Sequence, residues 1–255
     1  MSGSVDGVFE GQTAVVVGAA DGIGRATATL LAERGARVAC LDRNLPGAAE
    51  VARAIGGESG DALALEMDVL DAAAVETAIG QVRERLGPIA ALVNCAGTTG
   101  VTGRRSEEVD VEDFDLVYRV NLRGAFLLSK AVLPGMVAEG YGRILHVASI
   151  AGKEGNAGMV AYSASKAGLI GMVKAQGKEY AGTGVTVNAL APAVIRTAMV
   201  DAMPPAQVEY MTERIPMRRT GRLEEAAETI CWAVSPACSF TTGFTFDLSG
   251  GRAVY

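Results

Sequence analysis

A serine, a tyrosine and a lysine stand in an order and spacing that could move a proton. Tyr162 lies thirteen residues after Ser149, and Lys166 follows four residues later. Residues four apart on a helix share a face, so the phenol and the ammonium would face the same space. A phenol, with a pKa of about 10, is a poor base near neutrality, but a nearby ammonium stabilises the phenolate and lowers that pKa. These residues are therefore candidates for general acid–base chemistry.

A glycine-rich segment near the start of the chain has the pattern of a phosphate-binding turn. Gly18, Gly22 and Gly24 are spaced G-x-x-x-G-x-G between an apolar run and a helix-like stretch. Glycine permits a tight turn and lets backbone N–H groups approach a pyrophosphate, whose charge the N-terminus of the next helix stabilises. We expect this loop, which includes Asp21 and Ile23, to bind a dinucleotide.

The apolar run over residues 37–42 ends in an acid, Asp42. A carboxylate in this place can accept hydrogen bonds from the adenosine ribose hydroxyls and would repel a 2′-phosphate. Asp21 adds to that repulsion, whereas the guanidinium of Arg43 could pair with a phosphate. Because two acids should outweigh one exposed arginine, the sequence favours NAD over NADP.

The elements that must position these residues alternate along the chain. Short apolar or β-branched runs predict strands at 13–18, 37–42, 62–67, 89–94, 142–149, 185–191 and 245–247. Longer amphipathic or apolar stretches predict helices at 23–34, 72–86, 114–138, 160–180 and 223–234. Such alternation implies right-handed crossovers, and nearly continuous apolar strands are typical of a parallel sheet covered on both faces. We expect one α/β domain over 1–255, a Rossmann-type doubly wound parallel sheet of about seven strands with helices on both faces.

One long segment, residues 195–218, has no clear period. It contains Pro204-Pro205 and four methionines. Long irregular segments in compact domains often cover binding sites, so we expect a substrate lid here, with a plain surface excursion as the alternative.

Composition limits the possible partners. The formal charge is −6, with 23 basic and 29 acidic residues mixed along the chain, so nucleic acid is not expected as a partner. The first ten residues have neither a basic start nor an apolar run, and no eighteen apolar residues follow one another, so we expect no membrane segment and a cytoplasmic location. The cysteines lack C-x-x-C spacing, and we expect neither a disulfide nor a metal; they are Cys40, Cys95, Cys231 and Cys238.

Motifs in the order of one enzyme family run along nearly the whole chain. They are the G-A-A-D-G-I-G loop at 18–24, Asp68-Val69, N-C-A-G at 94–97, Asn121, Ser149, Y-S-A-S-K at 162–166 and A-P-A-V-I-R-T at 191–197. Over residues 11–251 the chain resembles the classical short-chain dehydrogenase/reductase family.

The resemblance implies a catalytic set of Asn121, Ser149, Tyr162 and Lys166. In it, Tyr162 exchanges a proton with an alcohol as hydride passes to the nicotinamide, and Ser149 positions the substrate oxygen. Lys166 also holds the nicotinamide ribose, and Asn121 anchors a water of the proton relay. The resemblance further implies a homotetramer built partly on the long helices after Phe114 and Val160. The residues expected at the cofactor are Gly18, Asp21, Gly22, Ile23, Gly24, Asp42, Arg43, Asp68, Val69, Asn94, Ala96, Gly97, Tyr162, Lys166, Pro192, Val194, Ile195 and Thr197.

Two positions depart from the family pattern. Pro192-Ala193 stands where a Pro-Gly pair is usual, so this turn should not require a positive φ. The change bears on how Val194 fits the nicotinamide. Cys95 replaces the second asparagine of the common N-N-A-G. Neither change removes a group that does chemistry.

The expected substrate is a polar small molecule. The polar stretch G-K-E-G-N at 152–156 follows Ser149, near the place of the substrate oxygen, and offers Lys153, Glu154 and Asn156. A carboxylate clamp could come from Arg104, Arg105 and Arg196. The polar stretch and the F-D-L-S-G-G-R-A tail resemble dehydrogenases of sugar acids, including those of 2-keto-3-deoxy sugar acids.

Three alternatives stay open. An NADPH-dependent 3-oxoacyl thioester reductase, to which the Y-S-A-S-K region is also similar, is disfavoured by Asp42. A non-catalytic NAD-sensing protein is disfavoured by the intact set of Asn121, Ser149, Tyr162 and Lys166. A hydrolase that uses His146 with Ser149 is disfavoured because strand positions 146 and 149 point to opposite faces.

Overall fold

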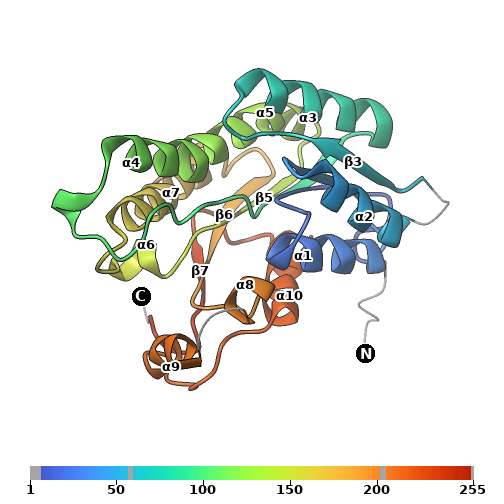
Figure 1. Cartoon of the computed structure of the whole chain (residues 1–255). Coiled ribbons are helices and arrows are strands. Elements are labelled where there is room, and N and C mark those ends of the chain that lie inside the picture. The colour runs from blue at the N-terminus through green and yellow to red at the C-terminus, as the bar shows by residue number, and fades with distance from the viewer. Residues whose placement is uncertain (1–6, 57–59, 202–204, 254–255) are drawn as a thin grey trace.

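The computed structural model describes residues 7–56, 60–201 and 205–253. Within these ranges seven parallel strands form one sheet in the order β3-β2-β1-β4-β5-β6-β7 (Figure 1). The strands are β1 Thr13–Val17, β2 Arg37–Asp42, β3 Ala62–Glu66, β4 Ile89–Asn94, β5 Gly142–Val147, β6 Val185–Pro192 and β7 Thr245–Leu248. The strand order changes direction between β1 and β4. Ligands of such sheets bind beyond the carboxyl ends of the strands at this point.

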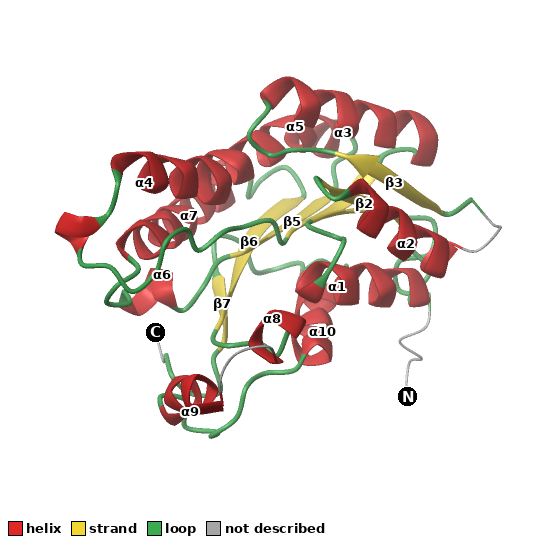
Figure 2. Cartoon of the chain, in the orientation of Figure 1, coloured by secondary structure: helices red, strands yellow, loops and turns green. Residues whose placement is uncertain are grey.

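Helices cover both faces of the sheet (Figure 2). One face packs on α3, α5 and α7, and the other on α1, α2 and α10. Successive side chains of a strand point to opposite faces, so Val15 lies in the first core and Val16 in the second. The helices are α1 Gly22–Glu33, α2 Leu45–Gly56, α3 Ala72–Leu86, α4 Val111–Tyr118, α5 Gly124–Ala138, α6 Ala151–Glu154, α7 Val160–Glu179, α8 Ala198–Asp201, α9 Pro205–Glu213 and α10 Leu223–Ala233.

The predicted fold class is confirmed, and every predicted strand is present. Strands β2 and β4 and helix α3 have the predicted bounds, while β5 ends at Val147, two residues before the predicted end. The long helix predicted at 114–138 was wrong in detail, because α4 and α5 are separated by a π-helical turn, Arg119–Arg123. Helix α2 was not expected, because its first residues, Leu-Pro-Gly, are typical of a turn. Proline is nevertheless tolerated in the first turn of a helix.

The segment predicted as a lid contains two short helices, α8 and α9. Its first residue, Ile195, forms a parallel bridge with Gly221, which lies just after the segment. Pro204 lies outside the described residues.

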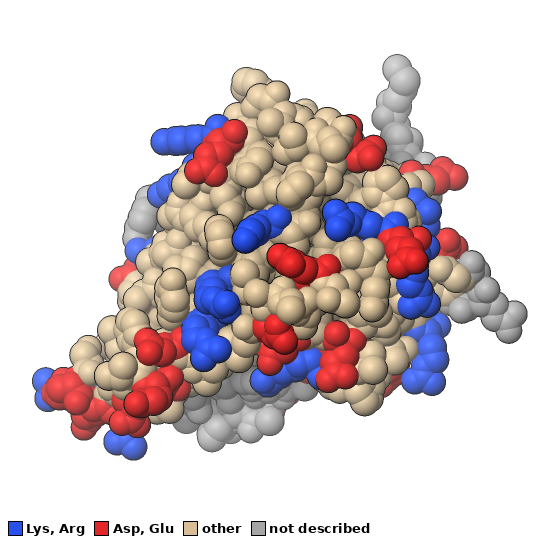
Figure 3. Space-filling view, turned by 90° about the horizontal axis from the view of Figure 1, so that it is seen from above, with Lys and Arg blue, Asp and Glu red and all other residues tan. Residues whose placement is uncertain are grey.

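The surface carries charges of both signs. Acidic and basic side chains are interspersed on the face seen in Figure 3. Over the described ranges, the helices are too short or too polar to include a membrane span.

Candidate active site

The glycine turn after β1 brings two backbone segments into contact. Gly18 has a φ of 77°, and a Cβ on it would lie 2.9 Å from the backbone nitrogen of Ala96. A Cβ on Gly24 would lie 1.9 Å from the carbonyl oxygen of Gly18. Asp21 caps α1 by accepting a hydrogen bond of 2.7 Å from the nitrogen of Gly22. Only glycine fits at positions 18 and 24, so the turn leaves a side-chain-free wall such as a pyrophosphate needs.

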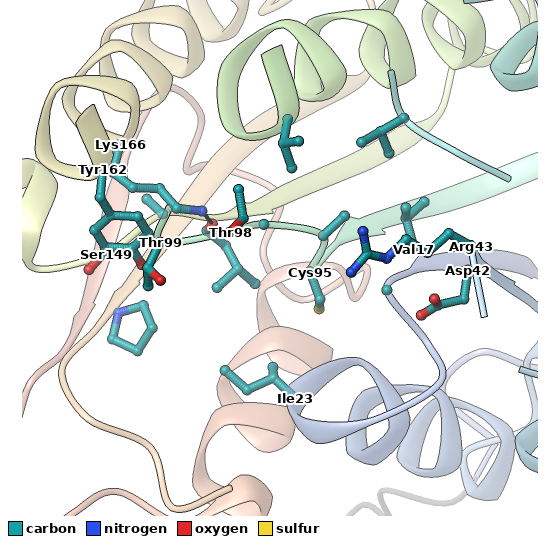
Figure 4. Close-up of a pocket in the computed structure, with 18 of the residues that line it drawn as sticks. Val17, Ile23, Asp42, Arg43, Cys95, Thr98, Thr99, Ser149, Tyr162 and Lys166 are labelled. Carbon is teal, nitrogen blue, oxygen red and sulfur yellow. Dashed lines mark hydrogen bonds between the residues drawn. The ribbon is translucent and has the colours of Figure 1, made fainter. Parts of the chain in front are cut away.

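This turn borders a cavity of about 660 Å³ at the carboxyl ends of the strands. Figure 4 shows Asp42 and Arg43 at one end of the cavity and Ser149, Tyr162 and Lys166 at the other. We call these the Asp42 end and the Tyr162 end. The predicted cofactor residues that line the cavity are Gly18, Ile23, Asp42, Arg43, Asp68, Val69, Ala96, Gly97, Tyr162, Lys166, Pro192, Ile195 and Thr197. The predicted residues that are not part of its wall are Asp21, Gly22, Gly24, Asn94 and Val194.

Asp42 holds the glycine turn as well as facing the cavity. Its Oδ2 accepts a hydrogen bond of 3.0 Å from the nitrogen of Ala20, and its Oδ1 accepts one of 2.9 Å from the nitrogen of Asn44. Both bonds fix the carboxylate at the carboxyl end of β2. A negative charge is therefore held beside Arg43, where an adenosine ribose would bind.

The Tyr162 end is assembled by α7 and by the end of β5. Tyr162 and Lys166 lie one turn apart on α7, and Nζ of Lys166 is 5.8 Å from the centroid of the Tyr162 ring. The same Nζ donates a hydrogen bond of 2.7 Å to the carbonyl oxygen of Val147. Ser149 Oγ accepts one of 3.1 Å from the nitrogen of Ala151, the first residue of α6. A phenol, an ammonium and a hydroxyl thus meet at one end of the cavity.

Burial sets the pKa values of the two titrating groups. It lowers the pKa of Lys166 to about 8. It raises the pKa of Tyr162, and a hydrogen bond with Ser149 opposes this only in part. The direction expected from the sequence for Tyr162 was therefore wrong for this structure. The reason is geometric. Lys166 Nζ donates its hydrogen bond to Val147 and not to the phenol, and burial removes water from the phenol.

Asn121 lies in the π-helical turn behind the cavity wall. Its Oδ1 accepts a hydrogen bond of 2.8 Å from the nitrogen of Thr98, and its Nδ2 donates to the carbonyl oxygen of Thr98 at 2.9 Å and to Ser165 Oγ at 3.0 Å. Thr98 itself lines the cavity. Asn121 therefore fixes the strand-end loop that borders the Tyr162 end, and π-turns of this kind are frequent at functional sites.

A buried polar chain that sequence reasoning missed supports the same loop. Asn94 Oδ1 accepts a hydrogen bond of 3.1 Å from the nitrogen of Ala96, which leaves its amide nitrogen to donate to His146 Nδ1 at 3.3 Å. His146 Nε2 then carries the proton and donates to Ser129 Oγ at 2.9 Å. Burial lowers the pKa of His146 to about 3, so the ring is neutral. The partners of His146 are Asn94 and Ser129, which gives the hydrolase alternative no support.

The residues predicted to bind substrate divide into two groups. Ser149 and Tyr162 line the cavity, whereas Lys153, Glu154, Asn156, Arg104 and Arg196 are absent from its wall. Lys153 pairs with Asp247 at 3.1 Å, and Glu154 and Asn156 both bind Arg252. Arg196 pairs with Asp201 at 2.7 Å, and Arg105 with Glu107 at 3.2 Å. Thr98 and Thr99 lie near Tyr162 in the wall, and their place directly after N-C-A-G could have indicated them. Leu116 and Val120, which precede Asn121 in the chain, also line the cavity.

The two departures from the family pattern are accommodated. Among the described non-glycine residues only Arg218 has a positive φ, so the turn at Ala193 needs no glycine, as expected. Cys95 lines the cavity, and burial raises the pKa of its thiol to about 12. This thiol is therefore protonated and unreactive near neutrality.

Comparisons with known proteins agree with this geometry. The family model of the short chain dehydrogenases matches residues 12–207. The chain is 43% identical over 249 residues to a 2-dehydro-3-deoxy-L-rhamnonate dehydrogenase (NAD(+)) of Sphingomonas sp. strain SKA58, with 98% of each protein covered. It is 36% identical over 248 residues to a 3-oxoacyl-[acyl-carrier-protein] reductase of Thermotoga maritima, covering 96% of the chain and 99% of that protein. The solved structure of gox2181 matches with a TM-score of 0.92 and 30% identity, over 96% of this chain and 97% of that one.

Proposed function

The chain belongs to the short-chain dehydrogenase family, an oxidoreductase family that acts on CH–OH groups, and we propose that it is the NAD-dependent dehydrogenase of a 2-keto-3-deoxy sugar acid. The observation that carries the proposal is the single cavity with the Asp42 carboxylate at one end and Ser149, Tyr162 and Lys166 at the other. The 43% identity to a dehydrogenase whose name states both NAD and this substrate type supports it.

The residues of the cavity fit a dinucleotide. Gly18 and Gly24 keep side chains out of the turn where a pyrophosphate would approach the backbone. Asp42 holds a negative charge where a 2′-phosphate would have to bind, which favours NAD. Lys166 uses one N–H on Val147 and has two further donors for the nicotinamide ribose.

The chemistry then follows from the Tyr162 end. NAD supplies the hydride acceptor when bound. Ser149 donates a hydrogen bond to the substrate oxygen, and Tyr162 takes the proton of the alcohol as the carbonyl forms. Burial dominates the pKa of the resting phenol, and the Lys166 ammonium, whose pKa is about 8, would supply a positive charge that favours the phenolate during the reaction. A water, and not the amide of Asn121, would carry the proton on to solvent. In the reverse direction Tyr162 returns the proton to the ketone.

The substrate class rests on the similarity to the 2-dehydro-3-deoxy-L-rhamnonate dehydrogenase and on two hydroxyls of the wall. Thr98 and Thr99 add hydroxyls beside Ser149 and Tyr162, and these suit the hydroxyls of a sugar chain better than an acyl chain (Figure 4). We place the reaction in carbohydrate catabolism. A cytoplasmic location agrees with the four free cysteines, because thiols stay reduced in that compartment.

We further propose a homotetramer. Helices α4 and α5, which follow one another in the chain, carry exposed apolar side chains that a second copy of the chain could cover. These side chains are Phe114, Tyr118 and Phe126. Sedimentation should give about four times the mass of one chain, and a monomer at micromolar concentration would refute the assembly.

One experiment separates the proposal from its alternatives. Nicotinamide absorbance is followed with NAD and a panel of 2-keto-3-deoxy sugar acids, and in parallel with NADPH and a short 3-oxoacyl thioester. We expect turnover in the first assay. Turnover only in the second would identify the thioester reductase, in line with Arg43 and the relatives of that type. NADH binding without turnover of any substrate would favour the sensor.

A further inference from the structure

Ser149 and Tyr162 lie on either side of a short segment that contains two glycines in the left-handed region. Residues 155–159, which we call the connector, join α6, whose first backbone nitrogen donates a hydrogen bond to Ser149, to α7, which carries Tyr162. Gly155 and Gly158 have φ values of 72° and 74°, in the left-handed region that glycine favours. Contacts from outside α6 and the connector therefore add to the contacts with α7 in setting the position of Ser149 relative to Tyr162.

Side chains near the C-terminus bind α6 and the connector. Arg252 Nε donates a hydrogen bond of 3.0 Å to Glu154 Oε2, and its Nη2 donates one of 3.0 Å to Asn156 Oδ1. Lys153 Nζ donates to Asp247 Oδ2 at 3.1 Å. The side chains of Arg252 and Lys153 are only 11% and 7% exposed, so these ion pairs are screened less than surface pairs.

The C-terminal turn, residues 249–253, is itself fixed. Ser249 Oγ accepts a hydrogen bond of 3.0 Å from the nitrogen of Ala253, and the nitrogen of Ser249 donates to Asp247 at 3.0 Å. The nitrogen of Met217 donates to the carbonyl oxygen of Gly250 at 3.2 Å. A Cβ on Gly250 would lie 2.6 Å from Ile215, so the turn also packs closely on the segment that follows α9.

A shift of α6 would reach the catalytic residues directly. A Cβ on Gly152 would lie 2.6 Å from the carbonyl carbon of Lys166, so α6 is in tight backbone contact with the catalytic turn of α7. The nitrogen of Asn156 donates to Ser163 Oγ at 3.0 Å, next to Tyr162. The nitrogen of Gly103 donates to the carbonyl oxygen of Gly158 at 2.9 Å, which joins the connector to the loop after Thr99.

We propose that Arg252 is a positioning residue, which sets the spacing of Ser149 and Tyr162 by binding Glu154 and Asn156 and thereby fastening α6 and the connector to the C-terminal turn. The polar G-K-E-G-N stretch thus serves the reaction through geometry rather than by binding substrate. Misplacement of reacting groups by about 1 Å can cost up to about 100-fold in rate, so a modest loosening has a measurable effect. The kinetic part of this inference rests on the proposed function.

The test compares Arg252→Met with a matched control, Arg34→Met. Arg34 also forms an ion pair across a long sequence separation, with Glu228 at 2.6 Å, and its side chain is 14% exposed, but the pair joins α1 to α10 rather than to the connector. Arg252→Met should lower kcat about tenfold and leave the NADH dissociation constant within twofold. Arg252→Lys should have an intermediate kcat. The double variant Arg252→Met/Glu154→Gln should have a kcat no lower than that of Arg252→Met alone. Equal kcat in Arg252→Met, Arg34→Met and the unaltered enzyme would overturn the proposal.

A second readout needs no substrate. Hydrogen exchange, measured by mass spectrometry on peptides within residues 149–163, should become at least several-fold faster in Arg252→Met and stay unchanged in Arg34→Met. If Arg252→Met fails to fold, Glu154→Gln and Asn156→Ala test the same contacts from the connector side. If the hydrogen-exchange rates are unchanged in all three variants, the positioning role of Arg252 is refuted. Absence of sugar-acid turnover in the unaltered enzyme, with the exchange difference present, would refute only the proposed substrate.

Discussion

The Asp42 end of the cavity is built from neighbouring parts of the chain, whereas the Tyr162 end is built from distant ones. The glycine turn follows the first strand and Asp42 ends the second, and backbone nitrogens of the turn donate hydrogen bonds to the carboxylates of Asp21 and Asp42. Ser149, Tyr162 and Thr98 come from three separate segments and depend on Asn121, His146 and Arg252 behind them. The difference shows that binding can be encoded by local backbone geometry, while proton chemistry needs groups that tertiary contacts bury and aim.

The largest expected effect lies at the Tyr162 end. Tyr162→Phe keeps the ring and removes the hydroxyl, so kcat should fall by about 1,000-fold or more, within the range of lost general acid–base catalysis. The NADH dissociation constant, read by nicotinamide fluorescence, should change less than twofold because the Asp42 end is untouched. Retained turnover would mean that another group serves as the base.

Lys166→Met should affect both ends and also stability. Turnover and NADH affinity should fall together, since in the proposed function Lys166 serves both the phenol and the nicotinamide ribose. Burial lowers the pKa of Lys166 from 10.5 to about 8, so the folded chain binds fewer protons than the unfolded chain between these pH values. The free energy of unfolding therefore rises from about pH 8 to about pH 10.5, and below pH 8 the buried charge costs about 3 kcal/mol.

Lys166→Met removes that cost together with the hydrogen bond to Val147. At pH 7 its thermal midpoint should be no lower than that of the unaltered enzyme, and the stability gain on raising the pH from 8 to 10 should disappear. Lys174→Met, at an exposed position of the same helix, is the control. A clearly lower midpoint for Lys166→Met would contradict the direction of the pKa shift.

The smallest effect is expected at the Asp42 end. Asp42→Asn keeps one oxygen for the bond to Ala20, removes the charge and loses the bond from the nitrogen of Asn44, because an amide nitrogen cannot accept it. The ratio of kcat/KM with NADP to that with NAD should rise about tenfold, which corresponds to about 1.4 kcal/mol. Arg43→Ala in the same background should reverse part of the gain. An unaltered ratio in Asp42→Asn would show that this acid does not discriminate between the two nucleotides.

Local patterns in the sequence determined the strands, the glycine turn and the Tyr162–Lys166 pair. The apolar runs of β2 and β4 end in the polar residues Asp42 and Asn94, after which the loops begin, and these bounds follow from the sequence alone. Glycine spacing predicts a turn because backbone conformation depends on the residue itself and its neighbours. Helical spacing likewise places Tyr162 and Lys166 on one face.

Only the tertiary structure decided which partners the polar side chains have. The sequence shows that Lys153, Glu154 and Asn156 are polar and close to Ser149, and it does not show that Asp247 and Arg252 fold back onto them. The same holds for the direction of the Tyr162 pKa, because burial outweighs its hydrogen bond with Ser149. Ion pairs and desolvation depend on distances between residues far apart in the chain, which the packing of the sheet and its helices alone determines.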